Sequence, residues 1–128
     1  AHLFIPHEPL IFDRDANVIP LWKRKGMMDS PAYIEQVLGT NKLILEVIDE
    51  ILLKSAKKPI IILQGDHGYR RGKYSENTKL SILNAYYLPG KSCEVVWPAI
   101  SPYNSFRVIF NTYFKANYKI LKEKELAE

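Results

Sequence analysis

The stretch "KKPIIILQGDHGYRRGKY", Lys57 to Tyr74, decides the fold that the sequence predicts. Its four apolar residues, Ile60 to Leu63, have a proline before them and a glycine soon after them. An unbroken apolar run of this kind is typical of a strand that is covered on both faces, as in the centre of a parallel sheet. We therefore expect a central parallel strand that ends at Gln64.

A long amphipathic helix is predicted ahead of this strand. Ser30 can cap a helix and Pro31 suits its first turn, whereas Lys54 and Pro59 mark its end. Gly39 is a mild interruption of the pattern. Apolar residues recur at three- and four-residue steps: Ile34, Val37, Leu38, Ile44, Leu45, Ile48, Ile51 and Leu52.

The remaining segments predict further strands and helices that alternate along the chain. Residues 1–5, "AHLFI", predict a short strand, and residues 7–29 predict a long irregular connection. Strand, helix and strand would then form a right-handed βαβ unit. Residues 82–90 predict a further strand, and residues 101–114 predict a second helix. The predicted fold is α/β, with a mostly parallel sheet flanked by helices.

One side of the second predicted helix is apolar. Its members are Phe106, Ile109, Phe110 and Tyr113. The polar tail from Lys115 onward is expected to fray.

The composition fits one globular domain. The chain has 128 residues, of which 47% are hydrophobic and 25% charged, which excludes a largely disordered chain. A single cysteine, Cys93, excludes an internal disulfide framework and a cysteine-based zinc site within the chain. The net charge is +4, but the lysines are scattered, so we expect no nucleic-acid surface. Because the sequence begins inside a predicted strand, we expect residues 1–128 to be one domain that is a piece of a larger one.

A carboxylate and an imidazole stand side by side after the central strand. Asp66 and His67 lie between Gly65 and Gly68, and these glycines would let the backbone turn and bring both side chains to one point. A carboxylate oxygen and an imidazole nitrogen bind zinc, and manganese accepts the same pair. The alternative is a simple turn or helix cap in which the histidine donates to a backbone carbonyl.

Other polar residues could lie at the same edge of the sheet. His7 follows the first predicted strand, where it could donate to a substrate oxyanion or complete a metal shell, or face solvent in a loop. His2 lies inside that strand and is expected to be structural. Arg70, Arg71 and Lys73 could steer an anion, although such runs are more often solvated loop charges.

Four segments together resemble, in order and spacing, the carboxyl-terminal half of sulfatase-like proteins of the alkaline phosphatase superfamily. That group includes lipoteichoic acid synthases and phosphoethanolamine transferases. The resemblance covers most of the chain, and four motifs in register are more specific than a lone Asp-His pair. The segments are "HLFIPHEPLIFD" at 2–13, "IIILQGDHG" at 60–68, "LSILNAYYLPG" at 80–90 and "ISPYNSFRVIFNTYF" at 100–114.

The resemblance implies a partial α/β sandwich with a divalent metal, zinc or manganese, at the carboxyl edge of its sheet. Asp66 and His67 match the family's Asp-His metal ligands, and His7 matches a histidine that contacts the substrate's phosphate or sulfate. In the family, a metal-activated threonine or serine attacks phosphorus or sulfur and forms a covalent intermediate. The implied activity of the parent protein is hydrolysis or transfer of a phosphate or sulfate ester, which in some relatives is lipid-linked.

This chain departs from the family in one respect. The nucleophile and the remaining acidic ligand come from upstream segments, and no serine or threonine here matches that nucleophile. Ser30, Ser75, Thr78 and Ser81 fit cap or loop positions better. We therefore expect the chain alone to be inactive, to hold metal weakly and to self-associate through an uncovered sheet edge and apolar face.

The resemblance also concerns the setting of the parent protein. Many relatives are anchored in a membrane with this domain outside the cytoplasm, in the periplasm or at the cell surface. Membrane contact would then come only from segments outside this chain. The alternative function is a non-catalytic sulfatase-like domain that serves in binding or interaction.

Overall fold

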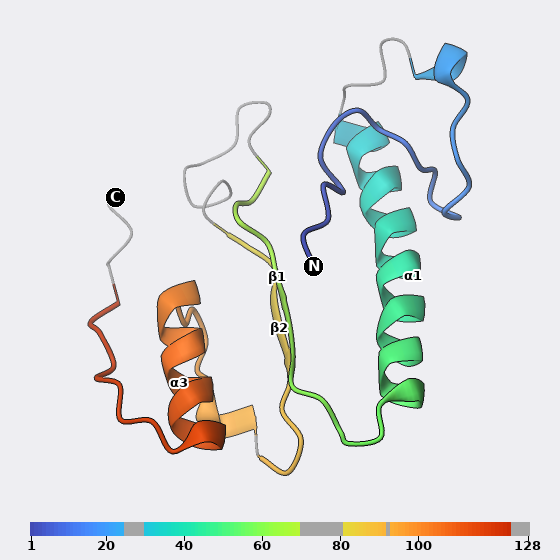
Figure 1. The fold of residues 1–128 in the computed structure, drawn as a ribbon. Coiled ribbons are helices and arrows are strands. Elements are labelled where there is room, and N and C mark those ends of the chain that lie inside the picture. The colour runs from blue at the N-terminus through green and yellow to red at the C-terminus, as the bar shows by residue number, and fades with distance from the viewer. Residues whose placement is uncertain (25–29, 70–80, 92, 124–128) are drawn as a thin grey trace. The chain divides into compact units, whose positions relative to one another are not determined.

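The computed structural model describes residues 1–24, 30–69, 81–91 and 93–123. Helices and strands are both present, so the fold is mixed α/β (Figure 1). The chain divides into two compact units, Ala1–Lys58 and Pro59–Glu128, and each is described by itself. The elements are η1 (Leu21–Lys23), α1 (Ser30–Lys54), β1 (Ile61–Gln64), β2 (Asn84–Tyr87), η2 (Cys93–Val95) and α3 (Pro102–Phe114).

In the first unit, the predicted helix is confirmed as α1. The helix begins at Ser30 with Pro31 in its first turn, a position where a missing backbone N–H costs nothing. The preceding predicted strand is absent: residues 1–4 have no regular structure, and both Leu3 and Phe4 are exposed. His2 is likewise exposed, so its predicted structural role is wrong. The βαβ unit therefore does not form in the described residues.

The tight loop around Asp13 packs on α1 at Gly39, which has no side chain. Asp13 Oδ1 accepts hydrogen bonds from the backbone N–H groups of Asp15 and Asn17, both at 2.9 Å. A Cβ atom added to Gly39 of α1 would lie 2.1 Å from the carbonyl oxygen of Asp13. The glycine that interrupts the sequence pattern is thus the point at which the loop approaches the helix.

In the second unit, the sheet of the described residues is antiparallel, so the predicted parallel sheet is wrong. β1 pairs with β2 in a register that places Ile61 opposite Tyr87 and Gln64 opposite Asn84. The ladder continues where Gly65 N–H donates to Leu83 carbonyl over 2.9 Å. An antiparallel pair needs no helical crossover, and the four residues of β1 are half-buried rather than covered on both faces. The apolar run therefore predicted a strand correctly but not its partner.

The second predicted helix is confirmed as α3. Ser101 caps it, with its side chain accepting from Asn104 N–H, and Pro102 occupies the first turn. Its buried apolar residues are Val108 and Ile109, beside Asn104 and Ser105. The predicted apolar side is therefore partly wrong: Ile109 is buried, but Phe106 and Phe110 are exposed.

The C-terminal residues 115–123, here called the tail strap, return along α3 (Figure 1). Lys115 reverses the chain in a left-handed conformation with φ 55°, and Ala116 N–H donates to Phe110 carbonyl over 3.3 Å. The prediction that the tail frays is therefore wrong for these residues, because polar side chains of α3 bind their backbone.

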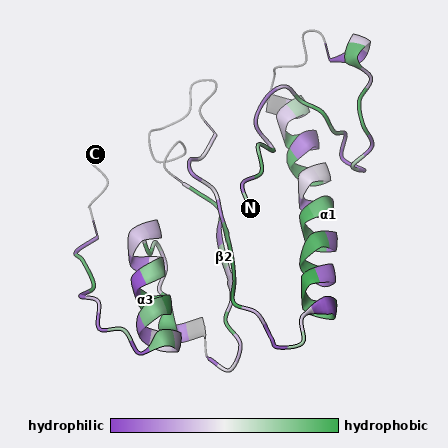
Figure 2. Cartoon of the chain, viewed as in Figure 1, coloured by the Kyte–Doolittle hydropathy of each residue, from purple (hydrophilic) through white to green (hydrophobic). Residues whose placement is uncertain are grey.

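Exposed apolar residues outnumber buried ones in the described part of the chain. Five hydrophobic side chains are buried there: Leu10, Ile19, Ile100, Val108 and Ile109. Twenty large ones are exposed, including Leu45, Val47 and Leu53 on the C-terminal half of α1, where Figure 2 shows hydrophobic residues beside hydrophilic ones. Surface of this kind normally packs against another protein surface. No described helix has the combined length and apolar character that a bilayer crossing requires.

Candidate functional site

The end of β1 positions both predicted metal ligands. The last ladder hydrogen bond is made by Gly65, and the chain then turns through Asp66 and His67. His67 Nδ1 lies 2.7 Å from the carbonyl oxygen of Gly68. Because a carbonyl can only accept, Nδ1 carries the hydrogen, and in the neutral ring the lone pair lies on Nε2.

That free nitrogen is on the side of the carboxylate. His67 Nε2 lies 4.0 Å from Asp66 Oδ2, and the side chains are 30% and 91% exposed, respectively. Two donors bound to one zinc ion at about 2.1 Å are typically about 3.0–3.4 Å apart. The observed separation is longer than this, so the binding of one cation by both residues stays a prediction.

The turn interpretation and the metal interpretation are compatible in this geometry. The histidine does donate to a backbone carbonyl, as the alternative requires, but through Nδ1. Metal-binding histidines commonly donate their second ring N–H to a carbonyl, which fixes the ring orientation. The hydrogen bond to Gly68 is therefore consistent with either interpretation.

His7 has the same local arrangement in the first unit. Its Nδ1 lies 2.8 Å from the carbonyl oxygen of Glu8, and its ring is exposed. The rings of Phe4 and His7 meet in a T-shaped arrangement, with their centroids 5.8 Å apart. Nδ1 therefore carries the hydrogen, and Nε2 is the atom that can meet a ligand.

Sequence reasoning missed the residue that holds the loop around His7. Gln36 of α1 is fully buried, and its Nε2 donates to the carbonyl oxygens of Pro6 and His7 at 2.9 and 3.1 Å. Its Oε1 accepts from the backbone N–H groups of Ile11 and Phe12. The signal was a glutamine two positions after Ile34 within the apolar pattern of the helix.

The three predicted site residues do not all belong to one unit. His7 lies in Ala1–Lys58, whereas Asp66 and His67 lie in Pro59–Glu128, so their convergence stays a prediction. The predicted anion-steering residues Arg70, Arg71 and Lys73 lie outside the described residues. In residues 1–24, 30–69, 81–91 and 93–123, no three His, Cys, Asp or Glu side chains are grouped as a metal site. Metal binding by Asp66 and His67 therefore stays a prediction.

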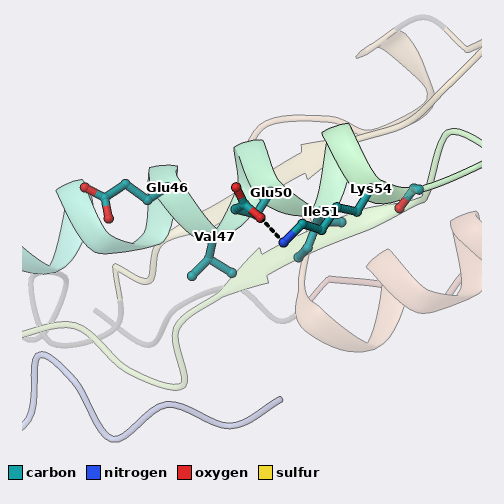
Figure 3. A pocket seen from close by; sticks show the side chains of 6 residues that line it. Glu46, Val47, Glu50, Ile51 and Lys54 are labelled. Atoms are coloured by element: carbon teal, nitrogen blue, oxygen red, sulfur yellow. Dashed lines mark ion pairs between the residues drawn. The ribbon is translucent and has the colours of Figure 1, made fainter.

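The first unit also has a hollow on α1. It has a volume of about 560 Å³ and is lined by residues of α1 and Ser55 that follows it (Figure 3). Val47 and Ile51 form its apolar part, and Glu50 pairs with Lys54 beside them. None of the predicted ligands lines it, so this hollow is not the candidate site.

Comparison with known proteins does not assign the chain to a family. A scan against models of protein families, a search of curated proteins and a search of solved structures each found no match. The resemblance to sulfatase-like proteins therefore stays a prediction that rests on the four segments quoted above.

Proposed function

We propose that this chain is part of a metal-dependent hydrolase or transferase of phosphate or sulfate esters, related to the sulfatase-like proteins. Asp66 and His67 would bind one divalent cation, zinc or manganese. The observation that supports this most directly is the arrangement of His67, whose Nδ1 is held by Gly68 while Nε2 lies on the side of Asp66.

The donor set fits such an ion. A carboxylate oxygen and an imidazole nitrogen are ligands that both zinc and manganese accept. When bound, the cation would lower the pKa of a nucleophile and offset negative charge on the reacting oxygens. Two donors from this chain leave positions for substrate and for protein ligands from elsewhere in the parent protein. The role of Asp66 and His67 is to hold and orient the ion.

His7 would bind the substrate's anionic group. Because its Nδ1 is engaged by Glu8, the ring has a hydrogen to offer an oxyanion only when Nε2 is protonated. A protonated ring would add positive charge as well as a hydrogen bond, which suits a phosphate or sulfate group. We therefore propose that His7 contacts the anionic group through Nε2.

The remaining expectations belong to the same proposal. The substrate would be a phosphate or sulfate ester, in some cases lipid-linked, and the parent protein would be membrane-anchored with this domain outside the cytoplasm. This chain alone would not turn over substrate, because the family's nucleophile has no counterpart in it. The proposal does not include a parallel sheet, since the described strands are antiparallel.

Calorimetric titration with zinc tests the proposed ligands. The chain should bind one zinc ion weakly, and Asp66→Ala and His67→Ala should each reduce affinity by about tenfold or more. His2→Ala and Asp49→Ala are controls that remove the same residue types from exposed positions elsewhere, and they should leave affinity unchanged. If the Asp66→Ala/His67→Ala double variant binds zinc like the wild type, the assignment is wrong.

The exposed aromatic residues of α3 favour a second candidate function. Phe106, Phe110 and Phe114 are all exposed at four-residue intervals on one side of the helix. Such a surface suits a non-catalytic sulfatase-like domain that binds another protein. The zinc titration separates the candidates, because an interaction domain has no need of Asp66 and His67 as ligands.

A further inference from the structure

Two asparagine side chains of α3 bind the backbone of the tail strap in the same way. Asn104 Nδ2 donates to the carbonyl oxygen of Leu121 over 2.8 Å, and its Oδ1 accepts from the N–H of Leu121 over 3.0 Å. Asn111 Nδ2 donates to the carbonyl of Tyr118 over 2.8 Å, and its Oδ1 accepts from the N–H of Tyr118 over 2.7 Å. Each amide thus satisfies both backbone groups of one residue, as a neighbouring β-strand would.

The spacing of the two asparagines matches an extended peptide. Seven residues of helix rise about 10.5 Å, and three residues of extended chain span about 10 Å. Asn111 binds residue 118 and Asn104 binds residue 121, so the strap runs toward the amino end of α3. Two equivalent pairings at matched spacing indicate a site for extended backbone rather than one chance contact.

The strap ends with a carboxylate at the amino end of α3. Glu123 Oε1 accepts from the backbone N–H of Ser101 over 3.2 Å and from Asn104 Nδ2 over 2.7 Å. The first N–H groups of a helix are unpaired within it and favour an anion. Tyr103 also donates from its hydroxyl to the carbonyl of Lys122 over 3.3 Å.

Two side chains of the strap add to this backbone recognition. One is Glu123, and the other is Tyr118, whose ring meets Phe110 edge-on with the centroids 6.0 Å apart. A peptide that fits the surface therefore needs an extended backbone, an aromatic residue at one end and an acidic residue five positions later.

We propose that Asn104, Asn111 and the amino end of α3 form a binding site for an extended peptide segment, and that residues 118–123 are its occupant within the same chain. This inference is independent of the metal site. It predicts that the same segment binds the site as a separate peptide when the chain's own strap is weakened.

A competition experiment on the full chain tests the proposal. The probe is a fluorescein-labelled, amidated peptide, ANYKILKE, with the sequence of residues 116–123. In the Glu123→Gln chain the strap loses its charge while the site on α3 stays intact. Fluorescence anisotropy should therefore show about tenfold tighter peptide binding than in the wild type.

Two matched comparisons decide the result. Adding Asn111→Ala to Glu123→Gln should weaken peptide binding about tenfold, and so should replacing the peptide's glutamate by glutamine. Circular dichroism checks that each chain keeps its helices. The proposal would be overturned if the wild-type and Glu123→Gln chains bound the peptide with equal affinity. It would also be overturned if adding Asn111→Ala left the peptide affinity unchanged.

Discussion

The side-chain nitrogen of Gln36 donates to the carbonyl oxygen of His7 over 3.1 Å, so a buried residue of α1 fixes the backbone that carries an exposed candidate site residue. The same amide makes three further hydrogen bonds to the loop, to Pro6, Ile11 and Phe12. A buried amide with both ends paired is stabilising, whereas the same loop without it would leave four backbone groups without that partner.

Replacing this glutamine should unfold the first unit more easily. Gln36→Ala should lower the free energy of unfolding by about 2–4 kcal/mol, because buried backbone groups lose their partners and a cavity forms. Urea denaturation followed by circular dichroism measures the change. Glu35→Gln is the control, since its partner Arg14 is well exposed and an exposed ion pair contributes little. An unchanged urea midpoint for Gln36→Ala would show that the hydrogen bonds of Gln36 do not stabilise the loop.

Gly39 offers a test of the close approach between loop and helix. In an open helix, Gly→Ala stabilises by about 1 kcal/mol, but here the new Cβ would meet Asp13 carbonyl at 2.1 Å. Because a backbone atom must move, we expect Gly39→Ala to destabilise the chain by about 1–3 kcal/mol. Asn41→Ala on the exposed side of the same helix is the control and should not destabilise it. Stabilisation by Gly39→Ala in thermal unfolding would show that the loop does not lie there.

The tail strap should release in acid. Burial raises the pKa of Glu123, but hydrogen bonds from Asn104 and Ser101 outweigh it and hold this pKa below its ordinary value. A carboxylate with a lowered folded-state pKa contributes stability above its unfolded pKa, and loses it as pH falls through the folded value.

The measurement compares wild type and Glu123→Gln. Their difference in urea midpoint should be present at about pH 7 and be smaller at about pH 3, because protonation of Glu123 begins to remove it. The comparison cancels the contribution of Asp13, whose pKa is also lowered, chiefly by the side-chain hydrogen bond from Asn17. A difference that is the same at both pH values would show that the charge of Glu123 does not hold the strap.

Local sequence signals predicted α1, α3 and β1 correctly, although the strand predicted at residues 1–5 does not form. Ser30-Pro31 and Ser101-Pro102 mark the starts of α1 and α3, and the apolar run before Gln64 marks β1. Capping and proline geometry depend on a few neighbouring residues, so one sequence is enough to reveal them.

Pairing and packing could not be predicted in the same way. The run from Ile60 to Leu63 is typical of a central parallel strand, but an antiparallel partner also accepts it, and nothing in the run specifies β2. The polar residues Gln36 and Asn104 interrupt apolar helical patterns, and only their distant backbone partners give them a role. The same limit holds for the site, because adjacency of Asp66 and His67 does not fix which ring nitrogen is free.

The exposed apolar surface predicts self-association of the chain. Within the described residues, twenty large hydrophobic side chains are exposed and five are buried, so association would remove much apolar area from water. Static light scattering should give a mass above 14.8 kDa that rises with concentration. Leu53→Glu and Phe114→Glu, at two strongly exposed positions, should each lower it. A wild-type mass of one chain at all concentrations would contradict this expectation.

The central claim is that Asp66 and the free nitrogen of His67 hold one divalent cation. Long-range nitrogen–proton NMR spectra of the imidazole rings, recorded during a zinc titration, test it most directly. The account predicts that the Nε2 resonance of His67 shifts on zinc addition, that Nδ1 keeps its hydrogen, and that Asp66→Asn weakens the response. A spectrum in which zinc leaves His67 unchanged, or binds at Nδ1, would contradict it.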